Sequence, residues 1–511
     1  MIFDTLVVID FGSQTNQLIT RRIREMGIYS VLLPPDTKIS QIKKMPGVKG
    51  IILSGGPHSV YEDSAFNVDE ALFELDIPIL GICYGMQWMA QHFGGKIDPG
   101  VAHEYGKVMM RITEESKLFK GLLSEQVVWM SHGDQIAVMP SSFEVIAQSS
   151  SCPYAAIKHK TKPFFGVQFH PEVHHTESGK LMLKQFAFDV CRANNNWEMA
   201  SFIDEQVHLI RETVQDKAVV LGLSGGVDSS VTALLLHQAI KSQLTCVFVD
   251  HGLLRQNEAE EVMHTFKDQF GLKVIKVDAK ERFLKALKGV IDPEEKRKAI
   301  GRAFIEVFEA TTDQLGDFHF LAQGTLYTDL IESGTQTAQL IKSHHNVGGL
   351  PKTMKLKLLE PLNTLFKDEV RVLGNVLKMP DEMVQRQPFP GPGLAIRILG
   401  EVTEERLDIV RNADAILREI FNDTGLNKTV WQYFTVLTPL KTVGVMGDKR
   451  SYEHVLAIRA VDSTDGMTAD FSKIPYDVLA QVSNRIVNTV RGVNRVVYDI
   501  TSKPPGTIEW E

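Results

Sequence analysis

Twice along the 511-residue chain, an apolar run passes through a glycine-containing turn directly into a helical pattern. The first case lies at residues 77–92 and the second at residues 217–240. An uninterrupted apolar run is typical of a parallel strand buried on both faces, and parallel strands need a crossover, usually a helix, between them. Ligands bind at the carboxyl ends of such strands. The pattern therefore predicts two α/β domains, each with a doubly wound, mostly parallel sheet and a site at its glycine turn.

Changes in pattern along the chain predict three domains. A polar stretch at 192–196 ends the first strand–helix series, so we expect the first domain at residues 1–196. The series then restarts and runs to RQPFPGPGLAIR, whose three prolines and two glycines predict a rigid, non-helical turn. We expect a second domain at 197–386 and a smaller α+β domain at 387–511, where few strand–helix–strand units fit.

Composition argues against several classes of protein. Hydrophobic residues make up 43% and charged residues 23%, which is ordinary for a globular protein, and a formal charge of -8 disfavours non-specific nucleic-acid binding. Four cysteines are too few for a disulfide framework, and the spacings of a zinc site are missing. No apolar run approaches the ~20 residues that cross a bilayer. We expect a cytoplasmic protein with neither a nucleic-acid nor a membrane partner.

Cys83 lies where the first apolar run ends, within the sequence GICYG. This is the thiol counterpart of G-x-S-x-G, in which glycines allow a sharp, strained strand-to-helix turn that exposes a nucleophile. The helix that follows directs its amino end at Cys83, which favours the thiolate. Most free cysteines, however, are small buried residues. The turn alone leaves the two interpretations about equal.

The segment GVQFHPE supplies the partners that a cysteine nucleophile needs. His170 and Glu172 are two residues apart, so in extended chain their side chains would point to the same face. Glu172 would then orient His170, which would take the proton from Cys83. A lone histidine is more often a hydrogen-bonded core residue, but the combination of turn, base and carboxylate favours catalysis.

Two further turns fit an acyl-transfer site. LSGGP, at 53–57, follows a strand, and its backbone N–H groups together with that of Tyr84 would bind an oxyanion. SHGD, at 131–134, is expected to be a short turn whose polar groups suit the charged ends of a free amino acid. Each of these is weak by itself, because ordinary turns have the same composition.

Together, GICYGMQ, SHGD and GVQFHPE resemble the class I glutamine amidotransferases over most of residues 1–196. The resemblance implies that glutamine is the source of ammonia. It implies these roles: nucleophile Cys83, base His170 and orienting residue Glu172; oxyanion hole Gly56 and Tyr84; glutamine contacts Gln87, Ser131, His132 and Asp134.

The second glycine turn is SGGVDSS, at 224–230. Gly225 and Gly226 allow the backbone to approach a phosphate closely, so that N–H groups converge on an anion. No lysine follows in the GxxxxGK[ST] pattern, so γ-phosphate transfer of the P-loop kind is not expected. Asp228 is interpreted as a Mg²⁺ ligand or as a charge at the amino end of the helix.

SGGxDS is similar to the pyrophosphate-binding motif of the ATP pyrophosphatase superfamily, which cleaves ATP between the α and β phosphates and leaves an adenylylated substrate. The resemblance implies ATP as co-substrate and these pyrophosphate contacts: Ser224, Gly225, Gly226, Val227, Asp228, Ser229 and Ser230. The end of the next predicted strand is placed to line the nucleotide pocket with Val249, Asp250, His251 and Gly252.

Four downstream segments narrow the family further: QGTLYTDLIES at 323–333, IKSHHNVGG at 341–349, RQPFPGPGLAIR at 386–397 and TSKPPGTIEWE at 501–511. With the two sites in this order, the whole chain resembles the glutamine-hydrolysing GMP synthetase family. The resemblance implies that ATP adenylylates the C2 oxygen of XMP and that ammonia then displaces AMP, with Mg²⁺ offsetting the triphosphate charge. The products would be GMP, AMP, pyrophosphate and glutamate.

The dianionic phosphate of XMP requires cations, and Lys503 lies in SKPPGT, where prolines stiffen the backbone. The family resemblance implies XMP contacts from Arg297, Gln432, Asp448, Lys503 and Glu509. Lys296 and Lys298, which flank Arg297, are interpreted as solvated surface lysines. The resemblance also implies a homodimer that forms through the C-terminal domain.

Three other functions remain to be weighed against this one. A glutamine-dependent NAD synthetase also uses an ATP pyrophosphatase domain, but it would carry a nitrilase-type Cys–Glu–Lys glutaminase. A CTP-synthase-like protein would need a P-loop lysine. A catalytically silent regulatory or nucleic-acid-binding protein would not need Cys83, His170, Glu172 and SGGVDSS together.

Overall fold

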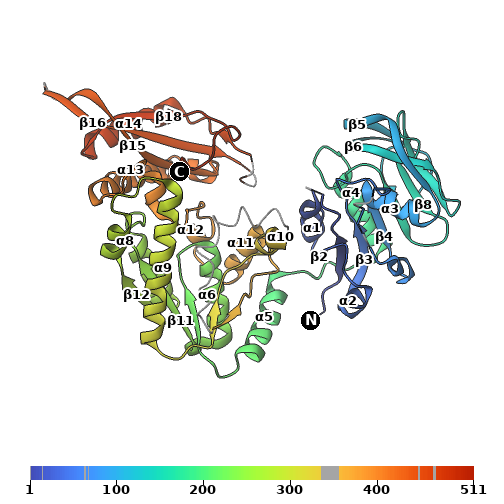
Figure 1. The fold of residues 1–511 in the computed structure, drawn as a ribbon, viewed down its shortest axis with the longest axis horizontal. Helices are drawn as coiled ribbons and strands as arrows, with labels where there is room; N and C mark the ends of the chain where they lie inside the picture. Colours follow the sequence, from blue (N-terminus) through green and yellow to red (C-terminus); the bar gives the residue numbers. More distant parts are fainter. Residues whose placement is uncertain are drawn as a thin grey trace. The chain divides into compact units, whose positions relative to one another are not determined.

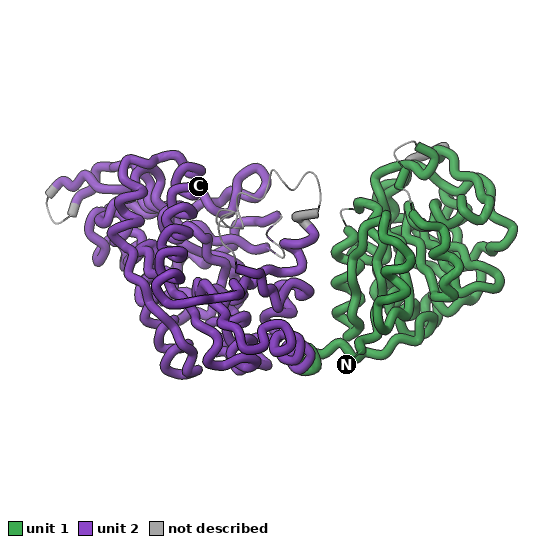
Figure 2. The backbone as a smooth tube through the Cα atoms, turned by 60° about the horizontal axis from the view of Figure 1, so that its bottom comes forward, with its two compact units in different colours: residues 1–202 green, residues 203–511 purple. Residues whose placement is uncertain are grey.

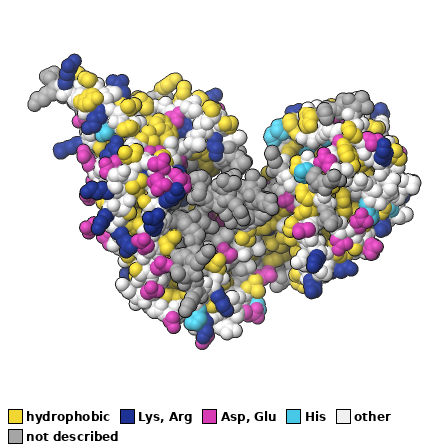
Figure 3. Space-filling view, in the orientation of Figure 1, with side chains coloured by type: hydrophobic (Ala, Val, Ile, Leu, Met, Phe, Trp, Pro, Cys, Tyr) yellow, Lys and Arg dark blue, Asp and Glu magenta, His cyan; other side chains and the backbone are white. Residues whose placement is uncertain are grey.

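A computed structural model describes residues 2–511 except residues 14, 63, 64, 67, 335–355, 447, 448, 464, 465 and 467. The chain divides into two compact units, Met1–Phe202 and Ile203–Glu511, which are green and purple in Figure 2. Within the described part of the chain, every helix is too short or too polar to span a bilayer. Lys and Arg side chains alternate with Asp and Glu across the visible face of the second unit (Figure 3).

The first unit is built on a nine-stranded sheet in the order β2-β1-β3-β4-β9-β8-β7-β5-β6. The first five strands of this order are parallel, and the last four join antiparallel. The strands are β1 (Thr5–Ile9), β2 (Tyr29–Leu33), β3 (Val48–Leu53), β4 (Ile79–Ile82), β5 (Lys96–Ile112), β6 (Glu125–Val138), β7 (Phe143–Ser149), β8 (Ala156–His159) and β9 (Phe164–Val167).

Helices pack on both faces of the parallel part of this sheet. Alternate residues of β1 point to opposite faces: Leu6 and Val8 belong to one apolar cluster, and Val7 and Ile9 to the other. The first cluster includes residues of α1 (Asn16–Arg24) and α4 (Gly179–Gln185). The second includes residues of α2 (Ile39–Lys44) and α3 (Tyr84–His92). The first unit is therefore doubly wound, as predicted.

The second unit begins with a five-stranded, wholly parallel sheet in the order β12-β11-β10-β13-β14. Its strands are β10 (Val219–Gly222), β11 (Leu244–Asp250), β12 (Val274–Asp278), β13 (Phe320–Ala322) and β14 (Lys357–Leu359). Its helices are α5 (Met199–Val214), α6 (Val227–Ile240), α7 (Glu258–Met263), α8 (Lys280–Leu287), α9 (Pro293–Leu315), α10 (Tyr327–Gly334), α11 (Lys367–Val376) and α12 (Asp381–Val384). The long helix α9 runs along β11 (Figure 1).

A second, smaller sheet completes this unit, with β16 (Lys449–Asp462) pairing β15 (Gln432–Met446), β17 (Asp470–Phe471) and β18 (Val493–Asp499). Helices α13 (Glu404–Asp423) and α14 (Tyr476–Thr489) pack beside it (Figure 1). The α+β character of this region is confirmed. The divisions at 196 and 386 stay predictions; the first compact unit ends at Phe202 and the second begins at Ile203.

The proline-rich segment at 386–397 differs in part from its prediction. Its last five residues, Gly393–Arg397, form a 3₁₀ helix, so the expectation of a wholly non-helical turn is wrong. Pro392 precedes this helix with φ −69°, a value that the proline ring fixes and that suits a first helical turn. Gly393 is required for another reason: its φ is +63°, and a Cβ there would lie 2.4 Å from the carbonyl oxygen of Leu253.

Gly85, in the first turn of α3, should not tolerate a side chain. A Cβ at Gly85 would lie 2.4 Å from the carbonyl oxygen of Leu53, and backbone cannot give way as a flexible side chain can. We expect Gly85→Ala to lower the free energy of unfolding by roughly 1–3 kcal/mol in denaturant titrations.

Gly222→Ala is the control for this substitution. Its Cβ would make an ordinary 3.5 Å contact with the Phe308 ring, so we expect a smaller change in stability. Equal unfolding midpoints for wild type and Gly85→Ala would show that the turn has room for a side chain.

Candidate active sites

Cys83 lies in a strained turn between β4 and α3. Its φ is 51° and its ψ −107°, a backbone conformation that non-glycine residues rarely adopt. The glycines on either side permit this turn, because a Cβ on Gly81 would lie 2.7 Å from the amide nitrogen of Met86, and Gly85 has no more room. The turn is held by a hydrogen bond from the amide of Cys83 to the carbonyl oxygen of Val167, 2.8 Å long.

The imidazole of His170 lies between Cys83 and Glu172. Its Nδ1 is 2.8 Å from Oε1 of Glu172, and the Cys83 thiol is close enough to raise the pKa of the ring. We had expected an extended strand at this point, and this expectation is wrong. Strand β9 ends at Val167, and Pro171 and Glu172 lie in a turn. The turn, rather than strand alternation, brings the two side chains together.

Two hydroxyl groups outside the predicted set position this pair. Thr15 Oγ1 donates to Oε1 of Glu172 at 2.6 Å, and Thr176 Oγ1 donates to the carbonyl oxygen of His170 at 2.6 Å. The amide of His170 donates to the carbonyl oxygen of Trp129 at 3.0 Å, which ties the main chain at His170 to β6. Nothing in the sequence indicated Thr15, because 157 residues separate it from Glu172.

The surroundings of His170 favour its protonated form. Burial alone lowers the pKa of His170, but the charge of Glu172 and hydrogen bonds with Cys83 and Glu172 outweigh it and raise the pKa to about 10. At neutral pH the ring is therefore an imidazolium held between a carboxylate and a sulfur.

The SGGP turn lies against both Tyr84 and His170. A Cβ on Gly55 would lie 3.1 Å from Cε1 of His170, and one on Gly56 would lie 3.2 Å from Cγ of Tyr84. The amide of Gly85 donates to the carbonyl oxygen of Ser54 at 3.0 Å, so this turn and the turn that carries Cys83 are joined directly. Gly56 and Tyr84 are thus placed beside Cys83.

The SHGD segment is brought to Cys83, but as part of a strand. Residues 131–134 lie within β6, so the expectation of a short turn is wrong. The Cys83 sulfur is 3.9 Å from the carbonyl oxygen of Ser131, and Nε2 of Gln87 donates to the carbonyl oxygen of Asp134 at 2.9 Å. The predicted glutamine contacts Gln87, Ser131, His132 and Asp134 therefore surround one place on the sheet.

The Asp134 carboxylate is held by two residues that the sequence did not reveal. Ser59 Oγ donates to one of its oxygens, and the hydroxyl of Tyr61 donates to the other at 2.9 Å. Gln168 was also missed, although it lies within the quoted GVQFHPE; its Nε2 is 3.6 Å from the Cys83 sulfur.

His132 is enclosed by acceptors on both sides of its ring. Its Nδ1 is 3.0 Å from the carbonyl oxygen of Asp134, and its Nε2 is 2.9 Å from Oε2 of Glu104. Burial lowers the pKa of His132, so the ring carries a single proton and only one of these contacts is a hydrogen bond. Strand register explains the meeting, because Glu104 of β5 pairs with His132 of β6.

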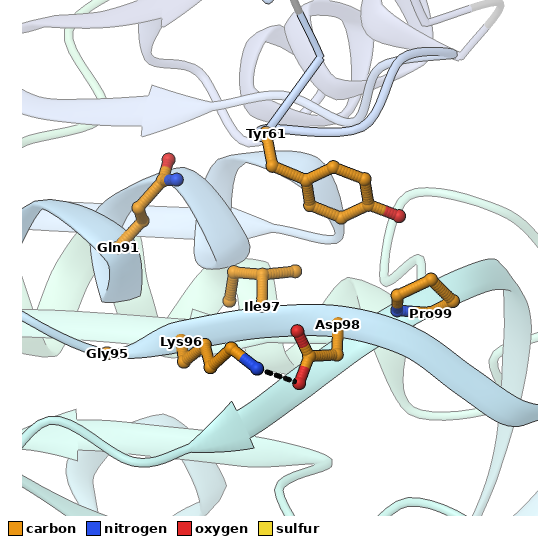
Figure 4. Close-up of a pocket in the computed structure, with 7 residues that line it drawn as sticks. All are labelled: Tyr61, Gln91, Gly95, Lys96, Ile97, Asp98 and Pro99. Carbon is orange, nitrogen blue, oxygen red and sulfur yellow. Dashed lines mark hydrogen bonds and ion pairs between the residues drawn. The ribbon is translucent and has the colours of Figure 1, made fainter.

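A small pocket of about 310 Å³ lies beyond Tyr61 (Figure 4). Figure 4 shows the Tyr61 ring across from Ile97 and Pro99 of β5, with Lys96 and Asp98 joined by a 2.7 Å ion pair. Its lining includes neither Cys83 nor His170. Two lining residues meet Asp134: Tyr61 donates a hydrogen bond to its carboxylate, and Pro99 of β5 pairs with it in the strand register.

The SGGVDSS loop of the second unit joins β10 to α6, as predicted, and α6 begins at Val227. Gly225 has φ +77°, a conformation that favours glycine. Ser224 and Ser229 tie the loop together, since their hydroxyl oxygens are 2.9 Å apart and the amide of Gly226 donates to Ser224 Oγ at 3.3 Å. The loop therefore presents hydroxyl and amide groups at the carboxyl end of β10.

A lysine reaches this loop from elsewhere in the chain. Nζ of Lys367, at the start of α11, donates to Oδ1 of Asp228 at 2.6 Å. Arg386 donates to the carbonyl oxygen of Gly225 at 3.1 Å and forms a 2.8 Å ion pair with Glu258. The P-loop pattern is missing, but two cations nevertheless meet the glycine loop, and 139 residues separate Lys367 from Asp228.

Strand β11 pairs with β10, the strand that leads into the glycine loop. At the end of β11, the side chains of Val249, Asp250 and His251 are buried. The Asp250 carboxylate faces Lys276 at 3.4 Å and Lys280 at 3.3 Å. Burial lowers the pKa of His251 to about 4, so its ring is neutral, and its Nδ1 accepts a hydrogen bond from the amide of Leu253 at 3.0 Å. Gly252 follows with φ +76°.

The structure brings together some of the predicted XMP contacts. Nε2 of Gln432 donates to Oε1 of Glu509 at 3.0 Å, and Arg297 donates to the main-chain oxygen of Glu511 at 2.6 Å. Lys503 donates to the carbonyl oxygen of Gly466 at 2.7 Å. Asp448 and the segment 341–349 lie outside the described residues.

The interpretation of Lys296 as a surface lysine is wrong. Its side chain is 0% exposed and forms an ion pair with Glu511. The neighbouring Lys298 is 56% exposed and pairs with Glu295 at 2.9 Å, as expected of a solvated residue. Both lie on α9, but they point to opposite sides of it, because two residues span about 200° of a helix.

Comparison with known families covers both units. The model of the glutamine amidotransferase class-I family matches residues 7–190, that of NAD synthase matches 198–303, and that of the GMP synthase C terminal domain matches 419–510. A GMP synthase [glutamine-hydrolyzing] of Geobacillus kaustophilus is 62% identical over 508 residues, covering 99% of both chains. The chain belongs to the glutamine-hydrolysing GMP synthases.

Two further GMP synthases are similar to this chain over its whole length. That of Bacillus subtilis is 60% identical and that of Ligilactobacillus salivarius is 62% identical, and each match covers 100% of this chain. The match to the NAD synthase model covers only part of the second unit. The alternative of an NAD synthetase is therefore not favoured. A GMP synthase of this kind is a ligase that carries a glutamine amidotransferase domain.

The raised pKa of His170 should make the stability of this GMP synthase depend on pH. Below the ordinary pKa of 6.5, His170 is protonated whether the chain is folded or unfolded, and its stabilising effect is complete. As the pH rises toward about 10, the unfolded chain has lost this proton and the folded chain then loses it too, so the stabilisation disappears.

We therefore expect the melting temperature of wild type to exceed that of His170→Asn at about pH 6.5, and the difference to shrink as the pH approaches 10. Scanning calorimetry of both proteins over this range measures it. A difference that does not change with pH would mean that His170 is uncharged in the folded protein.

Proposed function

We propose that this GMP synthase makes GMP from XMP, ATP, glutamine and water, and releases AMP, pyrophosphate and glutamate. The observation that carries the proposal is the presence of two sites in one chain. In the first, His170 pairs with Glu172 next to Cys83 at a strained turn. In the second, Lys367 and Arg386 contact a glycine loop. The first arrangement suits the release of ammonia, and the second suits the binding of a polyphosphate.

At the first site, the Cys83 sulfur attacks the amide carbon of glutamine and forms a carbon–sulfur bond. The amide oxygen becomes an oxyanion, which backbone N–H groups of Gly56 and Tyr84 stabilise. The His170 imidazolium gives its proton to the departing nitrogen, so ammonia leaves as a neutral molecule. The neutral His170 then takes a proton from water as the water attacks the thioester, which releases glutamate and restores Cys83.

Glu172 keeps the ring of His170 in one orientation through both proton transfers. Its side chain is 0% exposed, and Thr15 donates to the same oxygen, Oε1, that faces His170. We assign glutamine binding to Gln87, Ser131, His132 and Asp134. The Asp134 carboxylate, oriented by Ser59 and Tyr61, would receive the α-ammonium group of glutamine.

At the second site, the loop Ser224–Ser230 and the end of β11, Val249–Gly252, are assigned to ATP. The C2 oxygen of XMP attacks the α-phosphorus of ATP, and pyrophosphate departs. Ammonia then forms a bond to C2, and AMP departs with the oxygen. Amide and hydroxyl donors of the loop, with Lys367 beside it, offset the negative charge that develops on the pyrophosphate.

The residues at the glycine loop fit a magnesium ion that takes most of its ligands from phosphate and water. Asp228 supplies one carboxylate there, and Mg²⁺ is commonly held by one or two carboxylates together with substrate phosphates. When bound, Mg²⁺ would supply charge neutralisation for the triphosphate. The carboxylate of Asp228 is now occupied by Lys367, so the ion would share Asp228 with this lysine or displace it.

Arg297, Gln432, Lys503 and Glu509, with Asp448, are assigned to XMP. We also propose a cytoplasmic homodimer that forms through the C-terminal region. The dimer is supported by apolar side chains on β15 and β16 that remain exposed: Leu440, Val443, Val445 and Tyr452 are 54–76% exposed. Exposed apolar patches of this kind mark protein interfaces.

Amide-labelled glutamine tests the proposed reaction directly. With XMP, Mg-ATP and [amide-¹⁵N]glutamine, wild type should transfer the label to the exocyclic nitrogen of GMP. Cys83→Ala should lose glutamine-dependent synthesis by several orders of magnitude, because no thioester can form, but should keep synthesis from ammonium salts.

Mass spectrometry of GMP measures both outcomes, and Cys246→Ala is the matched control because Cys246 is a buried cysteine of the second unit. If Cys83→Ala lost both activities while remaining folded, the separation of the two sites would be wrong.

Asp228 and Lys367 should both be needed for pyrophosphate release. We expect Asp228→Asn and Lys367→Met each to lower the rate of pyrophosphate release at least about 100-fold, whether glutamine or ammonia is supplied, because each removes a charge at the phosphate loop. A coupled pyrophosphate assay follows this rate.

Asp216→Asn is the control for this pair. Asp216 also pairs with a lysine, Lys217 at 3.3 Å, but it is 80% exposed. Normal pyrophosphate release by Asp228→Asn would remove Asp228 from the mechanism.

A further inference from the structure

Residues 501–511 are held in the second unit by three cations, Lys296, Arg397 and Arg459, whose side chains are 0% exposed. The three belong to different elements: α9, the 3₁₀ helix Gly393–Arg397 and β16. A buried cation is destabilising unless fixed acceptors surround it. The partners of these cations therefore show which groups of residues 501–511 have fixed positions in the fold.

Lys296 is surrounded by acceptors from two segments. Its Nζ donates to the carbonyl oxygens of Ile398 at 2.7 Å and Ala395 at 3.4 Å, and to the carboxylate of Glu511. The other carboxylate oxygen of Glu511 accepts a hydrogen bond from the amide of Gly400 at 3.3 Å. Glu511 thus joins α9 to the chain that follows the 3₁₀ helix.

Arg297, the next residue along α9, is fixed by the same contact. Its Nη2 donates to the main-chain oxygen of Glu511 at 2.6 Å. Lys296 and Arg297 thus hold the side chain and the main chain of one residue. A change in the Lys296–Glu511 pair would therefore move the guanidinium of Arg297.

Arg397 orients Glu509 with two parallel bonds. Its Nη2 donates to Oε1 of Glu509 at 2.9 Å and its Nε to Oε2 at 3.2 Å, an arrangement that leaves a carboxylate little freedom to rotate. The ring of Phe434 covers the guanidinium, with its centroid 4.2 Å away. Gln432 adds a third donor to Glu509 at 3.0 Å.

Arg459 holds the backbone of the same segment without using these carboxylates. It donates to the carbonyl oxygens of Thr501 at 2.6 Å and Thr507 at 3.1 Å. Because this anchor remains when Glu511 is changed, substitution of Glu511 alone should not release the segment. The substitution should disturb the position of Arg297 more than the fold.

We propose that Lys296, Glu511 and Arg397 are positioning residues for XMP: the Lys296–Glu511 pair sets Arg297, and Arg397 sets Glu509. The inference rests on the proposed function, in which Arg297 and Glu509 contact XMP. None of the three positioning residues needs to touch the nucleotide. Their effect is to hold the guanidinium of Arg297 and the carboxylate of Glu509 in fixed positions.

Steady-state kinetics with ammonium as nitrogen donor tests the proposal, because this donor bypasses Cys83. We expect Glu511→Gln and Lys296→Met each to raise KM for XMP at least about 10-fold, which is about 1.4 kcal/mol of lost binding. KM for ATP and glutaminase activity should stay within about twofold of wild type, because these sites lie elsewhere in the fold.

The double variant separates positioning from general weakening. Since both residues act through one contact, Lys296→Met/Glu511→Gln should raise KM for XMP by about as much as either single variant, rather than by the product of the two effects. Lys298→Met is the matched control, because Lys298 lies on the same helix but is 56% exposed, and it should behave as wild type.

The possible results are distinguishable. If Glu511→Gln melts at a lower temperature but has the KM for XMP of wild type, the contact is structural only and the inference is overturned. If wild type makes no GMP from XMP, ATP and ammonium, the proposed function itself fails. If Lys296→Met does not fold, Glu511→Gln, in which Arg459 still anchors the segment, decides the question.

Discussion

The first unit depends on one backbone conformation, the positive φ of Cys83 between β4 and α3. A strained residue persists only where its surroundings determine it completely. Here Gly81 and Gly85 leave space that no side chain could share, and the amides of Cys83 and Gly85 are bonded to β9 and to the SGGP turn. The Cys83 sulfur, the turn that carries it and the SGGP turn therefore belong to one rigid assembly rather than to separate loops.

In the second unit, too, contacts from several segments hold the groups of the candidate site in place. Its glycine loop contains no lysine, yet Lys367 and Arg386 reach it from distant segments. Both the loop and these partners are fixed by the parallel sheet and the helices packed on it. The charge at this loop therefore depends on how the distant segments that carry Lys367 and Arg386 pack against it.

Much of the fold and of the first site followed from the sequence, because their signals are local. Uninterrupted apolar runs predicted the parallel strands, and the spacing of Gly81, Cys83 and Gly85 predicted the turn. Contacts between distant segments could not be predicted this way. Thr15 meets Glu172 across 157 residues, and Lys296 meets Glu511 across 215. Lys296 was therefore interpreted as a surface residue, since the sequence does not show whether a buried lysine has an acidic partner.

The burial of three cations against residues 501–511 also bears on how the chain reaches its folded state. Domains fold largely as units while the chain leaves the ribosome, amino-terminal parts first. Lys296, Arg397 and Arg459 are all synthesised before their acceptors in this segment. Until those acceptors emerge, each cation lacks part of its set of partners, although Lys296 can already reach the carbonyl oxygens of Ala395 and Ile398. The second unit thus completes the packing around these cations only after residues 501–511 have left the ribosome, when α9 is already formed.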